Sequence, residues 1–226
     1  MDDAPQRLGA QLDTIRDRWS GVAKARLDSM PDRALFEDRP YADPEARRAD
    51  RWAQAIPNRF RWARLEKLEP DQDPETLTLW ATAGTGNLLV HGPVGTGKSY
   101  AAVAACQHRH DRGEDVHWWP IVELLDGLRD EVADSTLATR LFDRLTEEAD
   151  VLVLDDLGGH RSTEWADERL YAIVNRRWLD ERPTVVTTNL SRGKLRDSVG
   201  ERILSRLLDG ATVVALDGAD RRTRRP

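Results

Sequence analysis

The sequence predicts an α/β fold built around a parallel β-sheet, and three observations support this prediction. Short apolar segments alternate with segments of helical periodicity between residues 88 and 216. One apolar segment, Val151–Leu154, contains no polar residue, as expected for a strand that helices cover on both faces. A glycine-rich turn joins the first strand to the next helix. Regular alternation of strands and helices indicates a parallel sheet between two helical layers.

The individual elements follow from this alternation. The predicted strands are Leu88–His91, Val116–Trp119, Val151–Leu154, Thr184–Thr188 and Thr212–Leu216. The predicted helices are Pro74–Ala83, Lys98–Asp111, Pro120–Glu131, Thr136–Ala149, Trp165–Asp180 and Leu195–Leu208. Apolar residues at spacings of three and four mark the inner faces of these helices. We therefore place the main domain at residues 56–226.

Residues 1–55 are predicted to form a small helical extension. An apolar stripe recurs there at spacings of four, three and four, through Leu12, Ile15, Trp19 and Val22. A second helix begins at residues 43–45, where an Asp cap, a proline at the first helical position and an acidic residue coincide, and runs to about Ala55. Because two short helices bury little area alone, they must pack on the main domain, on each other or on a partner protein.

Composition restricts the function classes. A hydrophobic fraction of 39% and a charged fraction of 33% over 226 residues describe a soluble globular protein. No apolar run approaches the ~20 residues of a membrane span, and the N-terminus lacks the layout of a signal peptide, so cytoplasmic localisation is predicted. The single cysteine, Cys106, excludes an internal disulfide. The net charge of −6 argues against DNA binding by bulk charge but allows a local basic strip.

The segment at residues 92–99 fits G-x-x-x-x-G-K-[ST], the phosphate-binding loop. Its glycines allow the backbone to approach phosphates closely, and its N–H groups form an anion-binding nest at a helix N-terminus. Lys98 is predicted to reach the β- and γ-phosphates, and Ser99 to ligate Mg²⁺. A plain Gly/Pro turn is the alternative, which the flanking strand and helix disfavour. The predicted ATP-binding residues here are Gly92, Pro93, Val94, Gly95, Thr96, Gly97, Lys98, Ser99 and Tyr100.

Polar residues at the ends of two later strands complete the predicted site. Asp155 follows an apolar strand downstream of the phosphate loop, the position from which an acid holds Mg²⁺. Asp156 is placed to orient the water that attacks the γ-phosphate. Asn189, at the end of the next strand, is predicted to contact that phosphate or the water, with a helix cap as the alternative. Hydrolysis of ATP to ADP and phosphate is therefore predicted.

Two arginines lie four residues apart on one face of a later predicted helix. These are Arg202 and Arg206. They are either ordinary surface arginines or arginines that face the nucleotide of a neighbouring subunit.

Four segments in this order give the chain a specific resemblance. They are GPVGTGKS at 92–99, LVLDDLGG at 152–159, TTNL at 187–190 and GERILSRLLDG at 200–210. Over residues 56–222 the chain resembles the AAA+ ATPases of the DnaC/DnaI helicase-loader and IstB transposition-helper group. This resemblance implies a five-stranded sheet of order 5-1-4-3-2, a minimal or absent lid domain, and nucleotide bound between the subunits of a spiral or ring.

The resemblance also implies roles for particular residues. Arg206 matches the arginine that acts in trans on the neighbouring subunit's nucleotide. Arg222 matches the sensor 2 arginine, with Arg221 as the neighbouring alternative. Residues 120–149 match helices that face single-stranded DNA in the central channel of the assembly.

The implied function is ATP-dependent loading of a replicative helicase onto single-stranded DNA. The short, cysteine-free N-terminal part and the arginine-rich composition suggest a phage or mobile-element version. The N-terminal helix would grip the helicase hexamer and hold its ring open. An IstB-like ATPase helper of DNA transposition is the alternative, because the ATPase core is common to both. A small-molecule kinase and a nucleotide-gated module without turnover are less consistent with the four segments.

Overall fold

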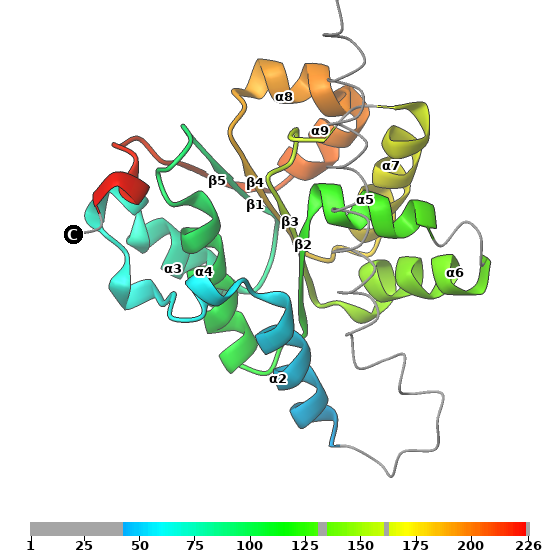
Figure 1. The fold of residues 1–226 in the computed structure, drawn as a ribbon, viewed down its shortest axis with the longest axis horizontal. Coiled ribbons are helices and arrows are strands. Elements are labelled where there is room, and N and C mark those ends of the chain that lie inside the picture. Colours follow the sequence, from blue (N-terminus) through cyan, green and yellow to red (C-terminus); the bar gives the residue numbers. More distant parts are fainter. Residues whose placement is uncertain (1–42, 131–134, 161–162, 225–226) are drawn as a thin grey trace, which may run out of the picture.

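The computed structural model describes residues 43–130, 135–160 and 163–224. The apolar stripe of residues 12–22 lies outside these residues. In Figure 1 a central β-sheet stands between two groups of helices, as the predicted α/β fold requires. No helix of the described ranges is both long and apolar enough to cross a membrane.

The sheet has five parallel strands in the predicted order. The strands are β1 (Leu88–His91), β2 (Val116–Pro120), β3 (Val151–Asp155), β4 (Thr184–Thr188) and β5 (Thr212–Ala215). They are arranged β2-β3-β4-β1-β5, which confirms the order 5-1-4-3-2. All four strand pairs are parallel, so the carboxyl ends of the strands lie along one edge of the sheet. In the register of β3 and β4, Leu154 pairs with Val186, which brings the residues after each of them together.

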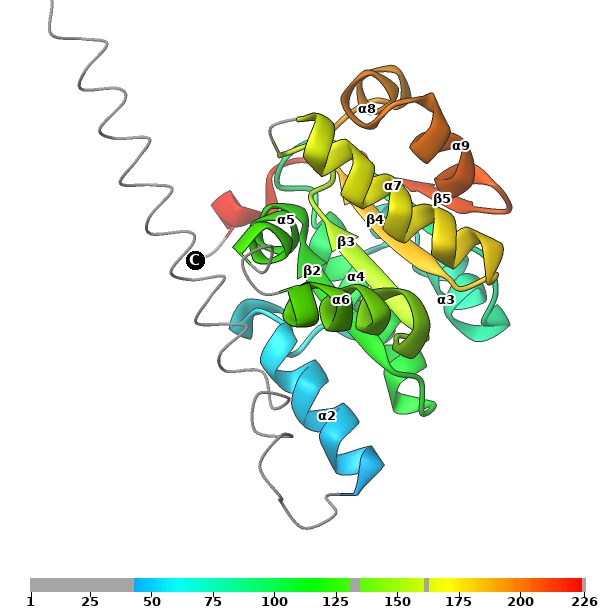
Figure 2. The same ribbon diagram turned by 90° about the vertical axis from the view of Figure 1, so that its right-hand side faces the viewer.

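Helices cover both faces of the sheet (Figures 1 and 2). On one face lie α2 (Pro44–Ala55), α3 (Pro74–Ala83) and α4 (Lys98–Asp111). On the other lie α5 (Ile121–Asp130), α6 (Ser135–Asp143), α7 (Glu164–Leu179), α8 (Arg192–Val199) and α9 (Glu201–Leu208). Successive strand residues alternate between the two resulting cores, with Val151 and Val153 in one and Leu152 and Leu154 in the other. Two separate apolar cores therefore hold β1, β2, β3 and β4 between them, whereas β5 contributes Val214 to the first core only.

One predicted helix is divided in two. The single helix expected at Leu195–Leu208 is wrong: α8 ends at Val199 and α9 begins at Glu201. Gly200, between them, has φ of 83°, a conformation that ends a helix and that side chains disfavour. The break lets α9 pack beside α7 while α8 takes a different direction (Figure 2).

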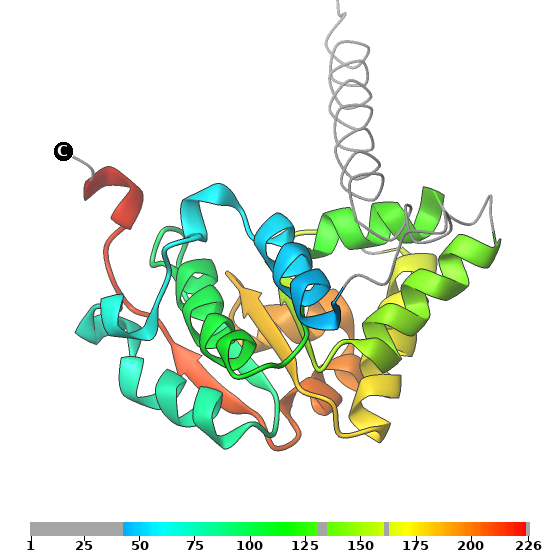
Figure 3. The same cartoon turned by 90° about the horizontal axis from the view of Figure 1, so that it is seen from below.

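Helix α2 packs on the main domain rather than standing apart from it. Its predicted cap is present, because Asp43 Oδ1 accepts a hydrogen bond of 3.1 Å from the Glu45 backbone N–H. Trp52 is buried, and its Nε1 donates to Gln107 Oε1 of α4 at 2.8 Å. Figure 3 shows α2 beside α4 on this face of the sheet. Of the alternatives for this helix, packing on the main domain is the one observed; the boundary at residues 55 and 56 stays a prediction.

Candidate functional site

The phosphate loop lies at the carboxyl end of β1 and leads directly into α4. Gly95 and Gly97 have φ of 87° and 93°, which glycine adopts without strain. A Cβ at Gly95 would lie 2.2 Å from the Asp220 carboxylate, and one at Gly97 would lie 2.6 Å from Gln72 Nε2. Both glycines are therefore required by backbone conformation and by the close approach of other segments to the outside of the loop.

The Lys98 side chain is buried and folds back onto the first half of the phosphate loop. Its Nζ donates a hydrogen bond of 2.7 Å to the Pro93 carbonyl oxygen. Burial lowers the pKa of Lys98, the negative charges of Asp156 and Asp155 oppose this shift, and Arg222 adds to it. The ammonium group thus lies among the charged residues predicted for the site. Its hydrogen bond to the Pro93 carbonyl can there be replaced by hydrogen bonds to phosphate oxygens.

Asp155 and Ser99 meet where β3 ends beside the start of α4. The Ser99 hydroxyl donates to Asp155 Oδ1 at 2.8 Å, and the Thr187 hydroxyl donates to the same oxygen at 2.6 Å. Burial raises the pKa of Asp155, hydrogen bonds from Thr187 and Ser99 lower it, and the charge of Asp156 raises it further. This carboxylate therefore favours a proton or a cation beside it.

The Ser99–Asp155 pair suits Mg²⁺. Magnesium takes oxygen ligands and is commonly held by one or two carboxylates together with waters and substrate phosphates. The described residues contain no cluster of three or more His, Cys, Asp or Glu side chains that could bind a metal unaided. A hydroxyl and a desolvated carboxylate next to the phosphate loop fit a magnesium ion that is bound together with nucleotide.

Asp156 and Asn189, predicted to act together on the attacking water, are in direct contact. Asn189 Nδ2 donates to Asp156 Oδ1 at 2.7 Å, and both side chains are exposed. Asp156 has φ of 59°, a left-handed conformation that costs energy outside glycine and occurs at functional sites. Asn189 does not cap α8, whose N-cap position is Ser191. The geometry thus favours the pairing of Asn189 with Asp156 over the helix-cap alternative.

Thr187 is the member of this group that the sequence prediction missed. Besides its bond to Asp155, its Oγ1 accepts a hydrogen bond of 2.9 Å from the Asp156 backbone N–H. One buried hydroxyl therefore fixes the positions of both acids. The sequence contained a signal for Thr187. Parallel pairing places the last residues of neighbouring strands side by side, so Thr187, near the end of its strand, is expected beside Asp155.

Arg206 lies away from these residues within one copy of the chain. Its backbone carbonyl accepts from Asn87 Nδ2 at 3.1 Å, and Asn87 precedes β1, whereas the phosphate loop follows that strand. A strand of this length spans about 13 Å. Arg206 and the phosphate loop thus belong to opposite ends of β1, and a role of Arg206 at the nucleotide requires a second copy.

The two C-terminal arginines occupy different places. The Arg221 backbone N–H donates to the Gly95 carbonyl at 2.9 Å, and its Nε donates to the Thr96 carbonyl at 3.1 Å. The Arg221 guanidinium also pairs with the Asp71 carboxylate. Arg222 contributes to the lowered pKa of Lys98. Arg221 therefore braces the outside of the loop, and Arg222 is the arginine whose charge acts on Lys98.

Comparison with known families agrees with this geometry, in which the phosphate loop lies beside Asp155, Asp156 and Asn189. Residues 64–226 match the family of IstB-like ATP binding proteins. The chain belongs to this family. Its resemblance to the DnaC/DnaI and IstB group is thereby confirmed, and ATP binding is the property that the family description names.

Several curated proteins are similar to this IstB-like chain. An ATP-binding protein of an insertion sequence of Mycobacterium tuberculosis is 28% identical over 97% of this chain and 91% of its own length. The replicative helicase loader DnaC of Escherichia coli K12 is 28% identical over 54% of this chain and 49% of its own length. The replicative helicase loader DnaI of Bacillus subtilis is 26% identical over 60% and 47%. The chain thus spans about half the length of these two loaders.

Solved structures share the fold. The crystal structure of the DnaC helicase loader superposes with a TM-score of 0.65 at 24% identity, covering 71% of this chain and all of that one. The crystal structure of DnaI gives a TM-score of 0.62 at 21% identity, covering 74% of this chain and 94% of that one. These neighbours confirm the AAA+ type of α/β fold.

Proposed function

We propose that this IstB-like protein hydrolyses ATP and uses nucleotide occupancy to switch an assembly on DNA. The observation that supports this proposal is the convergence of the phosphate loop, the Ser99–Asp155 pair and the Asp156–Asn189 pair at the carboxyl edge of the sheet. Each group has a place in phosphoryl transfer, for which positioning and charge stabilisation are the main requirements. A protein that only bound ATP would need the loop but not the second pair.

In the proposed reaction, backbone N–H groups of residues 92–97 and the Lys98 ammonium bind the β- and γ-phosphates. A magnesium ion held by Ser99 and Asp155 would neutralise charge on these phosphates. Asp156 accepts a hydrogen bond from a water and aims its oxygen at the γ-phosphorus, and Asn189 holds the Asp156 carboxylate in place. The new P–O bond forms as the bond between the γ-phosphorus and the β-phosphate oxygen breaks, the water gives up a proton to the departing phosphate, and ADP and phosphate leave.

We further propose that Arg206 acts in trans and that Arg222 acts in cis. Arg206 of one copy would stabilise negative charge on the phosphates bound by the next copy, a contribution worth about 10³–10⁵ in rate where arginine fingers are known. Such a site is incomplete in a single copy, so hydrolysis depends on assembly into a spiral or ring. Arg222 would add positive charge beside Lys98 in its own copy.

The proposed biological role is loading of a replicative helicase onto single-stranded DNA. The similarity to helicase loaders of E. coli and B. subtilis supports it. In this role the N-terminal helix predicted around residues 12–22 binds the helicase hexamer, and residues 120–149 contact the single strand. ATP favours the assembled, DNA-bound form, and hydrolysis releases it.

A helper ATPase of DNA transposition is the second candidate. It is favoured by one specific observation: the insertion-sequence relative matches 97% of this chain, including most of the N-terminal extension, whereas the loaders match little more than half. The extension is the part expected to choose the partner.

Capture of the partner separates the two candidates. The full-length protein is immobilised in the presence of ATP and Mg²⁺. It is offered the replicative helicase of its host in one experiment and the transposase encoded by a neighbouring gene in another. The loader proposal expects the helicase to be retained in an ATP-dependent manner and the transposase not. Retention of the transposase alone would contradict it and support the second candidate.

A further inference from the structure

The Arg206 side chain is held by residues of the neighbouring helix α7. Its Nε donates to Asn175 Oδ1 at 2.7 Å, and its Nη2 donates to the Tyr171 hydroxyl at 3.2 Å. Its Nη1 donates to the Arg202 carbonyl of its own helix at 2.8 Å. The guanidinium therefore has a defined direction already in one copy, before a neighbour is bound.

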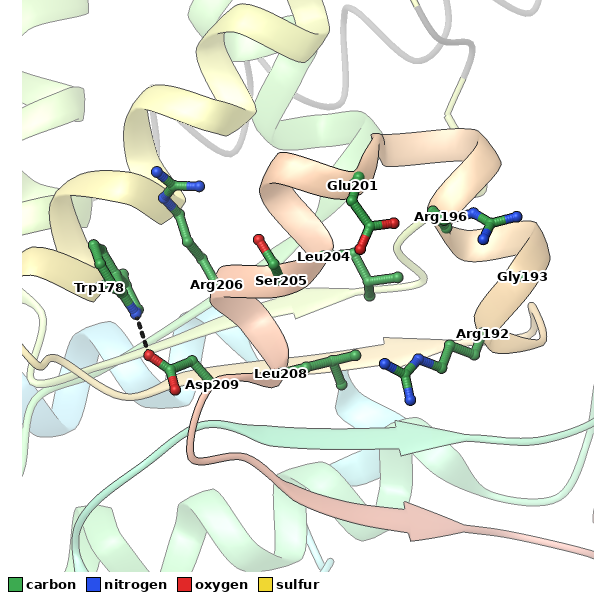
Figure 4. Close-up of a pocket in the computed structure, with 10 residues that line it drawn as sticks. All are labelled: Trp178, Arg192, Gly193, Arg196, Glu201, Leu204, Ser205, Arg206, Leu208 and Asp209. Atoms are coloured by element: carbon green, nitrogen blue, oxygen red, sulfur yellow. Dashed lines mark hydrogen bonds between the residues drawn. The ribbon is translucent and has the colours of Figure 1, made fainter.

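Two aromatic rings add to this hold. The Arg206 guanidinium carbon lies 5.0 Å from the Tyr171 ring centroid and 5.2 Å from that of Trp178, both within cation–π range. Trp178 is itself fixed, because its Nε1 donates to Asp209 Oδ2 at 2.7 Å (Figure 4). Tyr171, Asn175 and Trp178 follow one another at spacings of four and three, so one face of α7 supplies all three contacts.

The groups that hold Arg206 are all uncharged. Arg51, Arg109 and Arg221 each pair with a carboxylate, and such pairing neutralises a guanidinium. Among the ion pairs within the described residues, none joins Arg206 to a carboxylate. Amide, hydroxyl, carbonyl and ring contacts orient the group but leave its positive charge available to an anion from outside.

Arg206 is also accessible from outside. It lines a surface groove of about 820 Å³ between α8, α9 and the end of α7. Figure 4 shows Arg206 beside Trp178 at one end of this groove, with Arg192 and Arg196 of α8 at the other. A neighbouring copy can therefore approach the guanidinium without unfolding α9.

We propose that Asn175 and Tyr171 are positioning residues that hold Arg206 in the orientation required for a neighbouring copy's nucleotide. This inference rests on the proposed role of Arg206 in trans. Neither residue touches the nucleotide of its own copy. Each acts through Arg206, and a preformed orientation removes the cost of ordering a flexible side chain when the copies meet.

The test compares ATP hydrolysis by assembled protein carrying Asn175→Ala, Tyr171→Phe or Arg206→Ala. Tyr171→Phe is the matched variant that keeps the ring and removes the hydroxyl. Loss of one such hydrogen bond predicts a fall in kcat of about three- to tenfold in each of the first two variants, with KM for ATP unchanged. Asn175→Asp keeps an acceptor oxygen but adds a negative charge, so its kcat is expected to fall at least as far as that of Asn175→Ala.

Mixed assemblies distinguish positioning from damage to the fold. Asp156→Asn copies cannot hydrolyse under the proposed mechanism but carry an intact Arg206 and its α7 contacts. In a mixture with an excess of Asp156→Asn copies, most Asn175→Ala copies receive a correctly held Arg206 from their neighbour. They are expected to recover the wild-type rate per active site, because their own nucleotide site is intact. Arg206→Ala copies should recover in the same way.

The outcomes separate this inference from the proposed function. If Arg206→Ala hydrolyses at the wild-type rate, the role in trans is wrong. If Arg206→Ala is slow while Asn175→Ala and Tyr171→Phe are both unimpaired, the positioning inference is overturned. Failure of the Asn175→Ala mixture to recover, where the Arg206→Ala mixture does, would assign Asn175 a structural role and would also overturn it.

Discussion

Ser99 donates a hydrogen bond of 2.8 Å to Asp155, a residue 56 positions later in the chain. The first residues of α4 and the end of β3 therefore meet, and a hydroxyl and a carboxylate share the place proposed to bind magnesium beside the phosphate loop. This contact joins two motifs that the sequence shows only separately.

Substitution of Asp155 by asparagine should stabilise the protein in the absence of nucleotide. Burial raises the pKa of Asp155 above its ordinary 3.8, so the contribution of this group to stability is greatest below that pH and is lost as the pH rises through the folded-state pKa. The neutral amide removes this loss and can still accept from Ser99 and Thr187. We expect a higher Tm for Asp155→Asn at pH 7, by roughly 2–4 °C for each kcal/mol gained.

The pH dependence checks this explanation. The Tm difference between Asp155→Asn and wild type should shrink as the pH falls through the raised folded-state pKa of Asp155, and it should be smallest below 3.8, where the carboxyl is protonated in the unfolded state as well. Magnesium-dependent ATP hydrolysis should be lost in the same variant. A lower Tm for Asp155→Asn at pH 7 would contradict the assignment of a destabilising buried carboxylate.

Lys98→Ala should weaken ATP binding. A hydrogen bond to a charged group contributes about 1.5–3 kcal/mol, which corresponds to a loss of roughly 10- to 150-fold in affinity. The measurement is titration with a fluorescent ATP analogue in the presence of Mg²⁺. Lys194→Ala, which removes an exposed lysine of α8, is the matched control and should bind normally. Equal affinity of Lys98→Ala and wild type would show that the loop has been misassigned.

Thr187→Val should lower kcat although the side chain never meets substrate. Its hydroxyl orients Asp155 and the Asp156 backbone, and loss of such supporting contacts typically costs about 10- to 100-fold in activity or metal affinity. Steady-state ATPase assays at saturating Mg²⁺ measure the effect. Thr187→Ser keeps the hydroxyl and is expected to retain most of the activity; similar losses in both variants would mean that packing, not the hydroxyl, matters.

Arg177→Met should unfold the protein at markedly lower temperature. The buried Arg177 guanidinium donates five hydrogen bonds, to four backbone carbonyls and the Thr184 hydroxyl, and so ties α7 to the amino ends of β3 and β4. Each buried acceptor left unsatisfied costs about 1–3 kcal/mol, so we expect a loss of about 3–5 kcal/mol in the free energy of unfolding.

Chemical denaturation measures this loss, with Arg176→Met as the control. Arg176 is the preceding residue, but its ion pairs with Glu147 and Asp180 are exposed and contribute at most about 1 kcal/mol. If both variants lose the same stability, the buried hydrogen bonds of Arg177 are not the reason for its effect.

The parts of the site that follow local rules could be predicted from the sequence. Glycine spacing defined the phosphate loop, and the ends of apolar strands located Asp155, Asp156 and Asn189 at one edge of a parallel sheet. These predictions needed only the backbone preferences of glycine and the geometry of parallel strands.

The contacts that depend on how helices pack could not be predicted. A helical stripe gives the inner face of α7 but not which residue of α9 each position meets, so the contact of Asn175 with Arg206 was not foreseen. The break at Gly200 was missed because a glycine is tolerated within a helix at modest cost, and only the packing of α9 on α7 decides that it ends there. In the sequence Arg177 does not differ from other charged helix residues, because the backbone carbonyls that accept its hydrogen bonds come from other segments of the chain.

The central claim is that one copy binds ATP but two are needed to hydrolyse it. Turnover per copy, measured against protein concentration in wild type and in Arg206→Ala, tests this most directly. We predict that wild-type turnover per copy rises steeply as the protein assembles, and that Arg206→Ala binds ATP normally yet stays at the low rate of the single copy. Turnover that is independent of concentration, and equal in the two proteins, would contradict the account.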